Sequence, residues 1–441
     1  MEKYTVIGGN TLSGTTSVSG AKNVALKALV ASCLTEEDVV IQNIPLISDL
    51  HIMVEIINNL GGSVVVTDHT ATVSMKRFQK SAIPLDAAAE VRTSSMFIAP
   101  LLARTGEALI PNPGGCRLGA RPIDRTIDGL QAMGAEITYS SDDGFFHAKT
   151  KALKGITYRF EKNSHTATET MILAGVLAQG VTVLENAAEE PEVDELISLL
   201  KSMGASIKRS GKREITIRGV EKLHSGSLTV RPDRNEIVTL AVAAIVTKGD
   251  IFIVGSARDQ IGDFLEALTP AGGSFDMKED GIRFYYTGLL QAVSVTTSPH
   301  PGFMTDWQGP WALLMTQASG ESVIHETVFE NRFGYVKELR KMGAKIELFN
   351  PEVAEPKKTY NFNLSDDRPG FYHAARIFGP VKLHNGVVTI SDIRAGATLV
   401  LAALAASGES TILGIEKLDR GYEQLELRLG KLGARISRHA L

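Results

Sequence analysis

The sequence predicts an α/β protein of two similar domains, in each of which three α/β units arrange their sheets around buried helices. Three observations support this fold class. A helix-ending glycine tag recurs along the chain, the same order of elements precedes each tag, and one helix of every unit is apolar on most faces. The 441 residues accommodate six such units of about 70 residues each.

The recurring tag is a glycine that follows Leu, Met or Ala and precedes Gly or Ala. Its six copies are separated by 73, 70, 68, 71 and 90 residues and are centred on Gly61, Gly134, Gly204, Gly272, Gly343 and Gly433. Each ends an amphipathic run, as expected for the left-handed position just after a helix. The longer last interval predicts an insertion of about 20 residues within 347–390, where four prolines favour a surface excursion.

Each unit is expected to contain a buried helix, a short strand and a second helix that ends at the tag. The buried helices are expected to begin at or just after Lys22, Arg92, Lys162, Arg234, Asp306 and Arg394. The strands are expected over 39–43, 107–112, 181–186, 250–255, 322–326 and 410–414. One unit cannot bury its own apolar helix, so the helices must pack together. A doubly wound parallel sheet is the alternative, but it needs no such regular spacing.

The composition excludes several classes of protein. With 46 basic and 50 acidic residues the formal net charge is −4, which argues against a dedicated nucleic-acid binder. The two distant cysteines, Cys33 and Cys116, form neither a disulfide framework nor a zinc pattern and favour the reduced cytosol. We expect no signal peptide, no membrane span, no metal and no dinucleotide or P-loop motif.

Cations open helices where the helix dipole disfavours them. The first helices supply Lys22, Arg92, Lys162 and Arg394, and the second helices add Arg121, Arg332 and Arg420. Any one of these could be a solvated surface charge. Together they indicate an anionic ligand with several negative charges, such as phosphates plus a carboxylate.

One loop is longer in the second unit than in the others, and it contains Cys116. Its glycines make it flexible, and Arg117 and Arg121 beside the thiol favour the thiolate. The alternative is an exposed loop cysteine of no importance.

Asp306 is a carboxylate at a position where the other units have mostly basic residues. Among many cations it is expected to stay ionised and could act as a general base. It could equally be a helix N-cap held in an ion pair.

Five motifs together resemble the enolpyruvyl transferase family. They are Ser19-Gly20-Ala21-Lys22-Asn23, the loop from Pro113 to Asp124, Pro301-Gly302-Phe303-Met304-Thr305-Asp306, Phe329-Glu330-Asn331-Arg332-Phe333 and Asp419-Arg420-Gly421-Tyr422-Glu423. They extend from residue 19 to residue 423 and so cover nearly the whole chain. The resemblance implies two domains, residues 22–229 and residues 1–21 with 230–441. Each is an inside-out α/β barrel (βα prism) of three repeats, the active site lies in the cleft between them, and the Cys116 loop is a lid.

The resemblance also implies a reaction. The enolpyruvyl group of phosphoenolpyruvate would be transferred to the 3′-hydroxyl of UDP-N-acetylglucosamine with release of phosphate, as the first committed step of peptidoglycan synthesis. Cys116 matches the proton donor to C3 and the thiol attacked by the epoxide fosfomycin, and Asp306 matches the acceptor of the sugar hydroxyl proton. Phosphoenolpyruvate would be held by Lys22, Arg121 and Arg420, assisted by Arg332 and Arg394.

On the acceptor side the matching residues are Asn23, Arg92, Arg121, Pro122, Ile123, Asp124, Arg125, Lys162, Asn163, Ser164, His165 and Val328. The resemblance implies no cofactor and no metal. We expect a cytoplasmic monomer that binds neither nucleic acid nor membrane.

The third unit departs from the family pattern. It reads Lys162-Asn163-Ser164-His165-Thr166-Ala167-Thr168, where the family more often has Ser-Val-Gly-Ala-Thr, so His165 and Thr166 are bulkier than the pattern. Two other hypotheses therefore remain. One is a transferase with another acceptor, such as shikimate 3-phosphate or a nucleoside phosphate. The other is an inactive paralogue that binds the nucleotide sugar and regulates the pathway.

Overall fold

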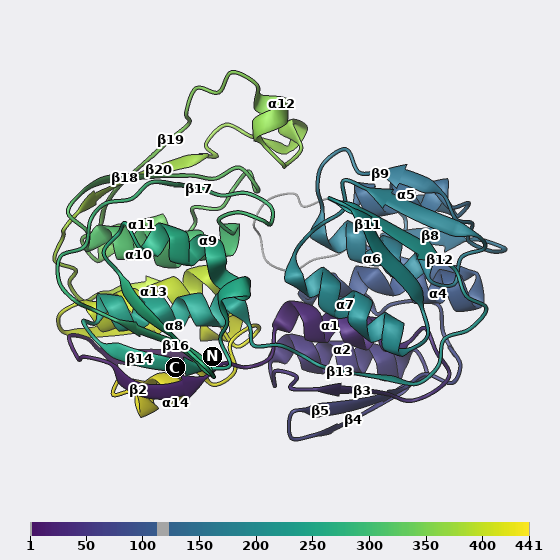
Figure 1. Cartoon of the computed structure of the whole chain (residues 1–441), viewed down its shortest axis with the longest axis horizontal. Coiled ribbons are helices and arrows are strands. Elements are labelled where there is room, and N and C mark those ends of the chain that lie inside the picture. Colours follow the sequence, from purple (N-terminus) through teal and green to yellow (C-terminus); the bar gives the residue numbers. More distant parts are fainter. Residues whose placement is uncertain (1, 113–122, 441) are drawn as a thin grey trace. The chain divides into compact units, whose positions relative to one another are not determined.

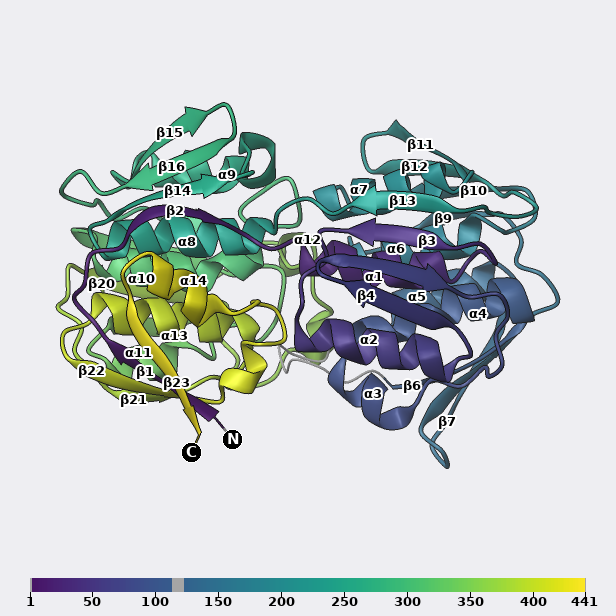
Figure 2. The same cartoon turned by 90° about the horizontal axis from the view of Figure 1, so that it is seen from below.

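The computed structural model describes residues 2–112 and 123–440. The described chain divides into two compact units (Figure 1, Figure 2). Residues 20–112 and 123–231 form one, here called the middle unit, and residues 2–19 and 232–440 form the other, here called the terminal unit.

Three small sheets belong to the middle unit. The first consists, in spatial order, of β13 (Gly226–Thr229), β3 (Val39–Gln42), β5 (Thr70–Ser74) and β4 (Ser63–Thr67). The second consists of β6 (Glu107–Pro111), β8 (Phe145–Lys149) and β7 (Glu136–Ser140). The third consists of β11 (Ser206–Gly211), β12 (Glu214–Arg218), β10 (Val181–Glu185) and β9 (Thr157–Arg159).

The terminal unit holds three further sheets, and the first strands of the chain belong to it. One consists of β15 (Ser274–Lys278), β16 (Gly281–Tyr285), β14 (Asp250–Val254) and β2 (Ser13–Ser17). Another consists of β17 (Val295–Thr296), β18 (Gly320–His325), β20 (Ala374–Gly379) and β19 (Lys345–Phe349). The last consists of β21 (Val387–Thr389), β22 (Glu409–Leu413), β1 (Glu2–Ile7) and β23 (Arg435–Ala440).

Strand pairing is mostly antiparallel in both units. In five of the six sheets one edge strand runs parallel to its neighbour, as β13 does with β3 and β2 with β14. This pairing is incompatible with a doubly wound parallel sheet, which was the alternative fold. The predicted class, small sheets around buried helices, is confirmed.

The buried helices form the centre of each unit (Figure 1). They are α1 (Lys22–Ser32), α4 (Ile98–Thr105) and α6 (His165–Gly175) in the middle unit, and α8 (Arg234–Val246), α10 (Gln308–Thr316) and α13 (Ile393–Ala405) in the terminal unit. Every residue of α8 is buried, and α8, α10 and α13 pack against one another. In the middle unit α4 packs on α6, and α1 packs on the 3-10 turn that precedes α4. The expected shared helical core is therefore present.

Two predicted helix starts were wrong in detail. The segments that begin near Arg92 and Asp306 open as 3-10 turns, η1 (Arg92–Phe97) and η2 (Thr305–Trp307), and become α-helical only afterwards. Such turns are frequent at the N-terminus of an α-helix. Sequence periodicity does not distinguish them from the helix that follows.

The second helix of each repeat ends close to its glycine tag. These helices are α2 (Ser48–Asn59), α5 (Asp124–Ala132), α7 (Pro191–Ser202), α9 (Arg258–Leu268), α11 (Val336–Lys341) and α14 (Leu425–Lys431). All six tag glycines have φ between +80° and +102°, the left-handed region that favours glycine. The remaining short helices are α3 (Leu85–Glu90), α12 (Pro356–Thr359), η3 (Leu364–Asp366) and η4 (Ile415–Lys417).

The predicted insertion is confirmed at residues 350–373, between β19 and β20, and it contains α12 and η3. Most of its residues are exposed. The middle of the insertion is held to the loop that follows β18, where the backbone N–H of Asn361 donates to the carbonyl oxygen of Thr327 at 2.7 Å.

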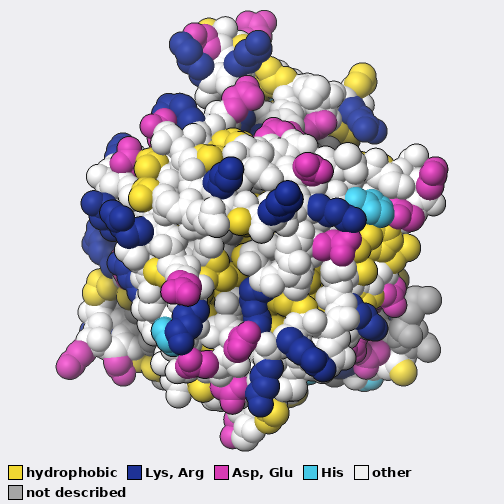
Figure 3. Space-filling model, turned by 90° about the vertical axis from the view of Figure 1, so that its right-hand side faces the viewer, with side chains coloured by type: hydrophobic (Ala, Val, Ile, Leu, Met, Phe, Trp, Pro, Cys, Tyr) yellow, Lys and Arg dark blue, Asp and Glu magenta, His cyan; other side chains and the backbone are white. Residues whose placement is uncertain are grey.

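Charges of both signs share the surface. On the face drawn in Figure 3, Lys and Arg side chains are interspersed with Asp and Glu. The described residues on this face form no large patch of one charge sign. Within residues 2–112 and 123–440, every helix is too short or too polar to cross a lipid bilayer.

Candidate active site

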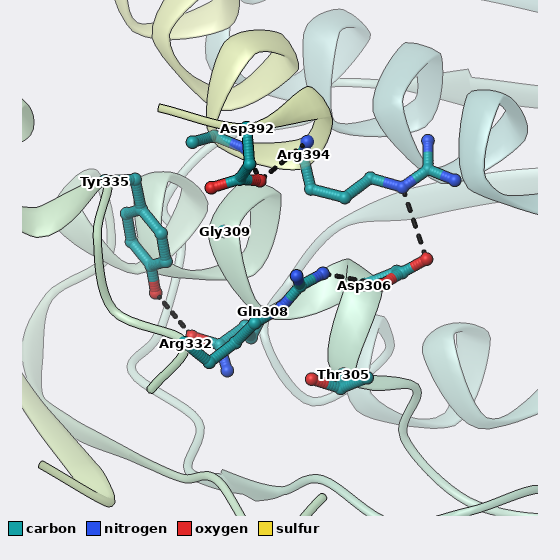
Figure 4. Close-up of a pocket in the computed structure, with 9 residues that line it drawn as sticks. Thr305, Asp306, Gln308, Gly309, Arg332, Tyr335, Asp392 and Arg394 are labelled. Atoms are coloured by element: carbon teal, nitrogen blue, oxygen red, sulfur yellow. Dashed lines mark hydrogen bonds and ion pairs between the residues drawn. The ribbon is translucent and has the colours of Figure 1, made fainter. Parts of the chain in front are cut away.

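A small pocket of the terminal unit is built around the carboxylate of Asp306 (Figure 4). One oxygen, Oδ1, accepts from Nη2 of Arg332 at 2.5 Å, and Oδ2 accepts from Nε of Arg394 at 3.2 Å. The pocket is lined by Thr305, Asp306, Gln308, Gly309, Arg332, Tyr335, Asp392, Arg394 and Ala395. Three of the predicted site residues therefore meet here.

Each of the three comes from a different element. Asp306 lies in η2, directly before α10, and Arg332 lies in the loop between β18 and α11. Arg394 is in the first turn of α13, whose N-cap is Asp392. Asp392 accepts from the backbone N–H groups of Arg394 and Ala395, both at 3.0 Å, and thereby orders the turn that carries the arginine.

Both arginines of the pocket have hydrogen-bond donors to spare, and Arg394 is held in its charged form. Burial acts to lower the pKa of Arg394, but the Tyr422 phenol and the Asp306 carboxylate outweigh it and the pKa is raised overall. The Nη1 atoms of Arg332 and Arg394 are buried and have no hydrogen-bond partner among the described residues. A carboxylate or phosphate would satisfy such donors, because charge-assisted hydrogen bonds from guanidinium groups are strong.

The predicted site residues of the middle unit lie at helix starts. Lys22 is the first residue of α1 and is followed by Asn23, and Arg92 opens η1. The ammonium of Lys22 lies 2.6 Å from Oδ2 of Asp49 in α2, so this cation has an internal counter-charge.

Two further helix starts in the middle unit carry predicted residues. At α5, Ile123 is the N-cap and Asp124 and Arg125 are the first two helical residues. At α6, Lys162 and Asn163 precede the N-cap Ser164, whose hydroxyl accepts from the Ala167 N–H at 3.3 Å. His165 follows as the first helical residue.

Two further predicted residues lie in loops of the terminal unit, and three lie outside the described residues. Val328 lies in the loop after β18 and donates its N–H to Glu326 at 2.7 Å, and Arg420 follows η4 and is half-buried. Cys116, Arg121 and Pro122 lie outside the described residues. Their roles stay predictions.

Sequence reasoning missed several residues that build the pocket. They are Thr305, Gln308, Glu326, Tyr335 and Asp392. Only Asp392 left a readable signal, since an aspartate two residues before a cation and an apolar run is typical of an N-cap. The others act through contacts between segments that are distant in sequence.

The unusual His165 belongs to a buried charged cluster. Its Nε2 lies 3.1 Å from both Oε1 of Glu169 and Nζ of Lys27, and Lys27 pairs with Glu169. Glu169 is fully buried. Burial acts to lower the pKa of His165, but the Glu169 carboxylate outweighs it and the pKa is raised above 6.5.

This cluster predicts pH-dependent stability. Because the folded-state pKa of His165 is raised, its stabilising effect is fully present below the unfolded value of 6.5 and is lost as pH rises through the folded value. We expect His165→Gln to lower the free energy of unfolding by about 1.5 kcal/mol near pH 6, the scale of a hydrogen bond to a charged group. The loss should be smaller at about pH 9, because the protonated fraction of the imidazole falls as pH rises.

Urea unfolding at the two pH values measures this difference, with His51→Gln on the exposed face of α2 as the control. An equal loss at both pH values would show that the protonated imidazole does not stabilise the fold.

Comparison with known proteins defines the class. The family model of EPSP synthase (3-phosphoshikimate 1-carboxyvinyltransferase) matches residues 6–429. The chain belongs to the EPSP synthase family and is an enolpyruvyl transferase. The predicted family and enzyme class are thereby confirmed.

Relatives that match over their full length carry names that specify one enolpyruvyl transferase. The chain is 39% identical over 443 residues to a UDP-N-acetylglucosamine 1-carboxyvinyltransferase of Acidobacterium capsulatum, covering 99% of this chain and 96% of that protein. It is 40% identical over 440 residues to the protein of that name from Magnetococcus marinus, covering 99% of each.

Solved structures share the fold over the whole chain. The enolpyruvyl transferase NikO from Streptomyces tendae aligns with a TM-score of 0.87 at 25% identity, covering 100% of this chain and 99% of that one. EPSP synthase from Acinetobacter baumannii aligns with a TM-score of 0.73 at 17% identity and covers all of both chains, which shows the fold alone.

Proposed function

We propose that this chain transfers the enolpyruvyl group of phosphoenolpyruvate to the 3′-hydroxyl of UDP-N-acetylglucosamine and releases phosphate, the first committed step of peptidoglycan synthesis. The observation that carries the proposal is the Asp306 carboxylate, which lies between the guanidinium groups of Arg332 and Arg394. A base beside cations suits a reaction that removes a hydroxyl proton next to an anionic donor. The names of the full-length relatives support this acceptor.

The proposed mechanism is addition followed by elimination. Cys116 donates a proton to C3 of phosphoenolpyruvate, so that C2 becomes electrophilic. The sugar hydroxyl then attacks C2 while Asp306 accepts its proton, which gives a tetrahedral ketal. Loss of a C3 proton and of phosphate restores the double bond.

The cations have the binding role in this proposal. Lys22, Arg121 and Arg420 hold phosphoenolpyruvate, and Arg332 and Arg394 offset negative charge as phosphate leaves. The acceptor contacts belong to Asn23, Arg92, the segment 121–125, the segment 162–165 and Val328.

A second candidate is the same chemistry with another acceptor, such as a nucleoside phosphate or shikimate 3-phosphate. The observation that favours it is His165, which is bulkier than the family pattern and is engaged by Lys27 and Glu169. Smaller residues at that position would leave more room for the acceptor.

Phosphate release from phosphoenolpyruvate tests both candidates. We expect release only when UDP-N-acetylglucosamine is also present, and none with shikimate 3-phosphate or uridine monophosphate as the sole acceptor. Release with one of those acceptors, and not with the nucleotide sugar, would move the assignment to the second candidate. Silence with all three would favour the inactive binding paralogue.

A further inference from the structure

Glu326 is a fully buried carboxylate at the end of β18, and it has no assigned role. It accepts four hydrogen bonds. Oε1 accepts from the backbone N–H groups of Val328 at 2.7 Å and Phe329 at 3.0 Å. Oε2 accepts from the Thr305 hydroxyl at 2.8 Å and from the side-chain amide of Gln308.

The two oxygens of Glu326 hold two different segments of the pocket. Oε1 orders the start of the loop that leads from Val328 to Arg332. Oε2 holds Thr305 and Gln308, which flank Asp306 on both sides in the chain. A single carboxylate therefore holds the segments on which Asp306 and its partner Arg332 lie.

The network continues beyond the carboxylate. Since the Gln308 amide nitrogen faces Glu326, its oxygen faces the other way and accepts from the Tyr335 hydroxyl at 3.0 Å (Figure 4). The backbone N–H of Glu326 donates to the carbonyl oxygen of His373 at 2.7 Å, so the last residue of the 350–373 insertion also contacts Glu326.

The two backbone N–H groups and the Gln308 amide nitrogen can only donate, and the Thr305 hydroxyl donates as well, so the contacts of the carboxylate oxygens favour the ionised form of Glu326. Burial raises the pKa of this carboxyl above its usual value, and the Thr305 hydroxyl, the Phe329 N–H and the Arg332 guanidinium oppose that rise. Full burial also means that water cannot replace a donor or acceptor that is lost.

We propose that Glu326 is a positioning residue of the transfer reaction, which sets Asp306 against Arg332 through the Thr305 hydroxyl and the Val328–Phe329 backbone. The expected changes in kcat and KM rest on the proposed function, whereas the positioning of Asp306 and Arg332 does not. A shift of about 1 Å in a reacting group can cost about 10²-fold in rate. Loss of Glu326 should therefore lower kcat by a larger factor than it raises the substrate KM values.

Glu326→Gln is the first test, with Glu338→Gln as its matched control. Glu338 is also a buried carboxylate of the terminal unit, but it pairs with Lys341 and with the Thr389 N–H, outside the pocket. The glutamine at 326 presents an NH₂ donor toward Thr305 and Gln308 in place of an acceptor. We expect kcat to fall about 10- to 100-fold with KM values within about threefold. A kcat within about twofold of the control would overturn the proposal.

Thr305 provides a second variant that leaves the buried charge in place. Thr305→Val removes only the hydroxyl that donates to Glu326, and Thr305→Ser restores it. The valine variant should lose kcat and the serine variant should recover most of it. Equal kcat values for the two would overturn the proposal even if Glu326→Gln fails to fold.

Tryptophan fluorescence gives a readout that needs no turnover. The chain has two tryptophans, Trp307 and Trp311, and both follow Asp306 closely in η2 and α10. Their emission maximum should move in Glu326→Gln and Thr305→Val and stay unchanged in Glu338→Gln. If the wild type transfers no enolpyruvyl group, the proposed function is wrong. The tryptophan emission maximum of the variants then tests the positioning role of Glu326 by itself. Unchanged emission in both pocket variants would then refute it.

Discussion

Asp306→Asn is expected to lower kcat for phosphate release by about 10³-fold, the scale of a lost general base. The asparagine keeps the shape of the side chain, but its amide cannot accept the sugar hydroxyl proton. It can also accept from only one of the two arginines that now donate to separate oxygens. Affinity for UDP-N-acetylglucosamine, measured by calorimetry, should remain largely intact.

A matched control shows whether loss of any aspartate–arginine ion pair lowers kcat, or only loss of the proposed base. Asp250 pairs with Arg283 through two hydrogen bonds of 2.8 and 2.6 Å on the sheet of β14 and β16, outside the pocket. Asp250→Asn should keep kcat close to that of the wild type. Near-normal turnover of Asp306→Asn would make the base assignment wrong and would leave Asp306 as a structural ion-pair partner.

Removal of the Cys116 thiol is the second change with a large expected effect. Cys116→Ala should lower kcat by about 10²- to 10⁴-fold, because the proposed proton donor to C3 is lost. Phosphate release in the presence of both substrates measures it. The same thiol should react covalently with the epoxide fosfomycin, and intact-mass analysis of wild type and variant should show one adduct that requires Cys116.

Cys33 is the natural control for this reaction. It is fully buried in α1's C-cap, and burial raises the pKa of its thiol to about 12, so little thiolate forms. Cys33→Ala should therefore keep the adduct. An adduct on Cys33, or none on the wild type, would contradict the assignment of Cys116.

The site was only partly predictable. Lys22 and Arg394 open helices, and their positions follow from the residues around them. The residues that pair with these cations cannot be predicted from neighbouring residues. Asp49 comes from the next helix, and Glu326, to which the sequence assigned no role, holds the pocket through Thr305 and Gln308. The 3-10 turn at Asp306 was also beyond sequence periodicity, because it differs from an α-helix only in its hydrogen-bond register.

The sequence by itself determined the repeat, because a helix end depends on a few neighbouring residues. The left-handed glycine after α2, and its five counterparts, needs no contact from elsewhere in the chain. Only the tertiary structure brought Asp306 to Arg332 and Arg394, which lie 26 and 88 residues away. Local backbone preferences act within one or two helical turns. Asp306 and Arg394 meet because α10 and α13, at whose starts they lie, pack against each other, and Arg332 joins them from the loop that Glu326 orders.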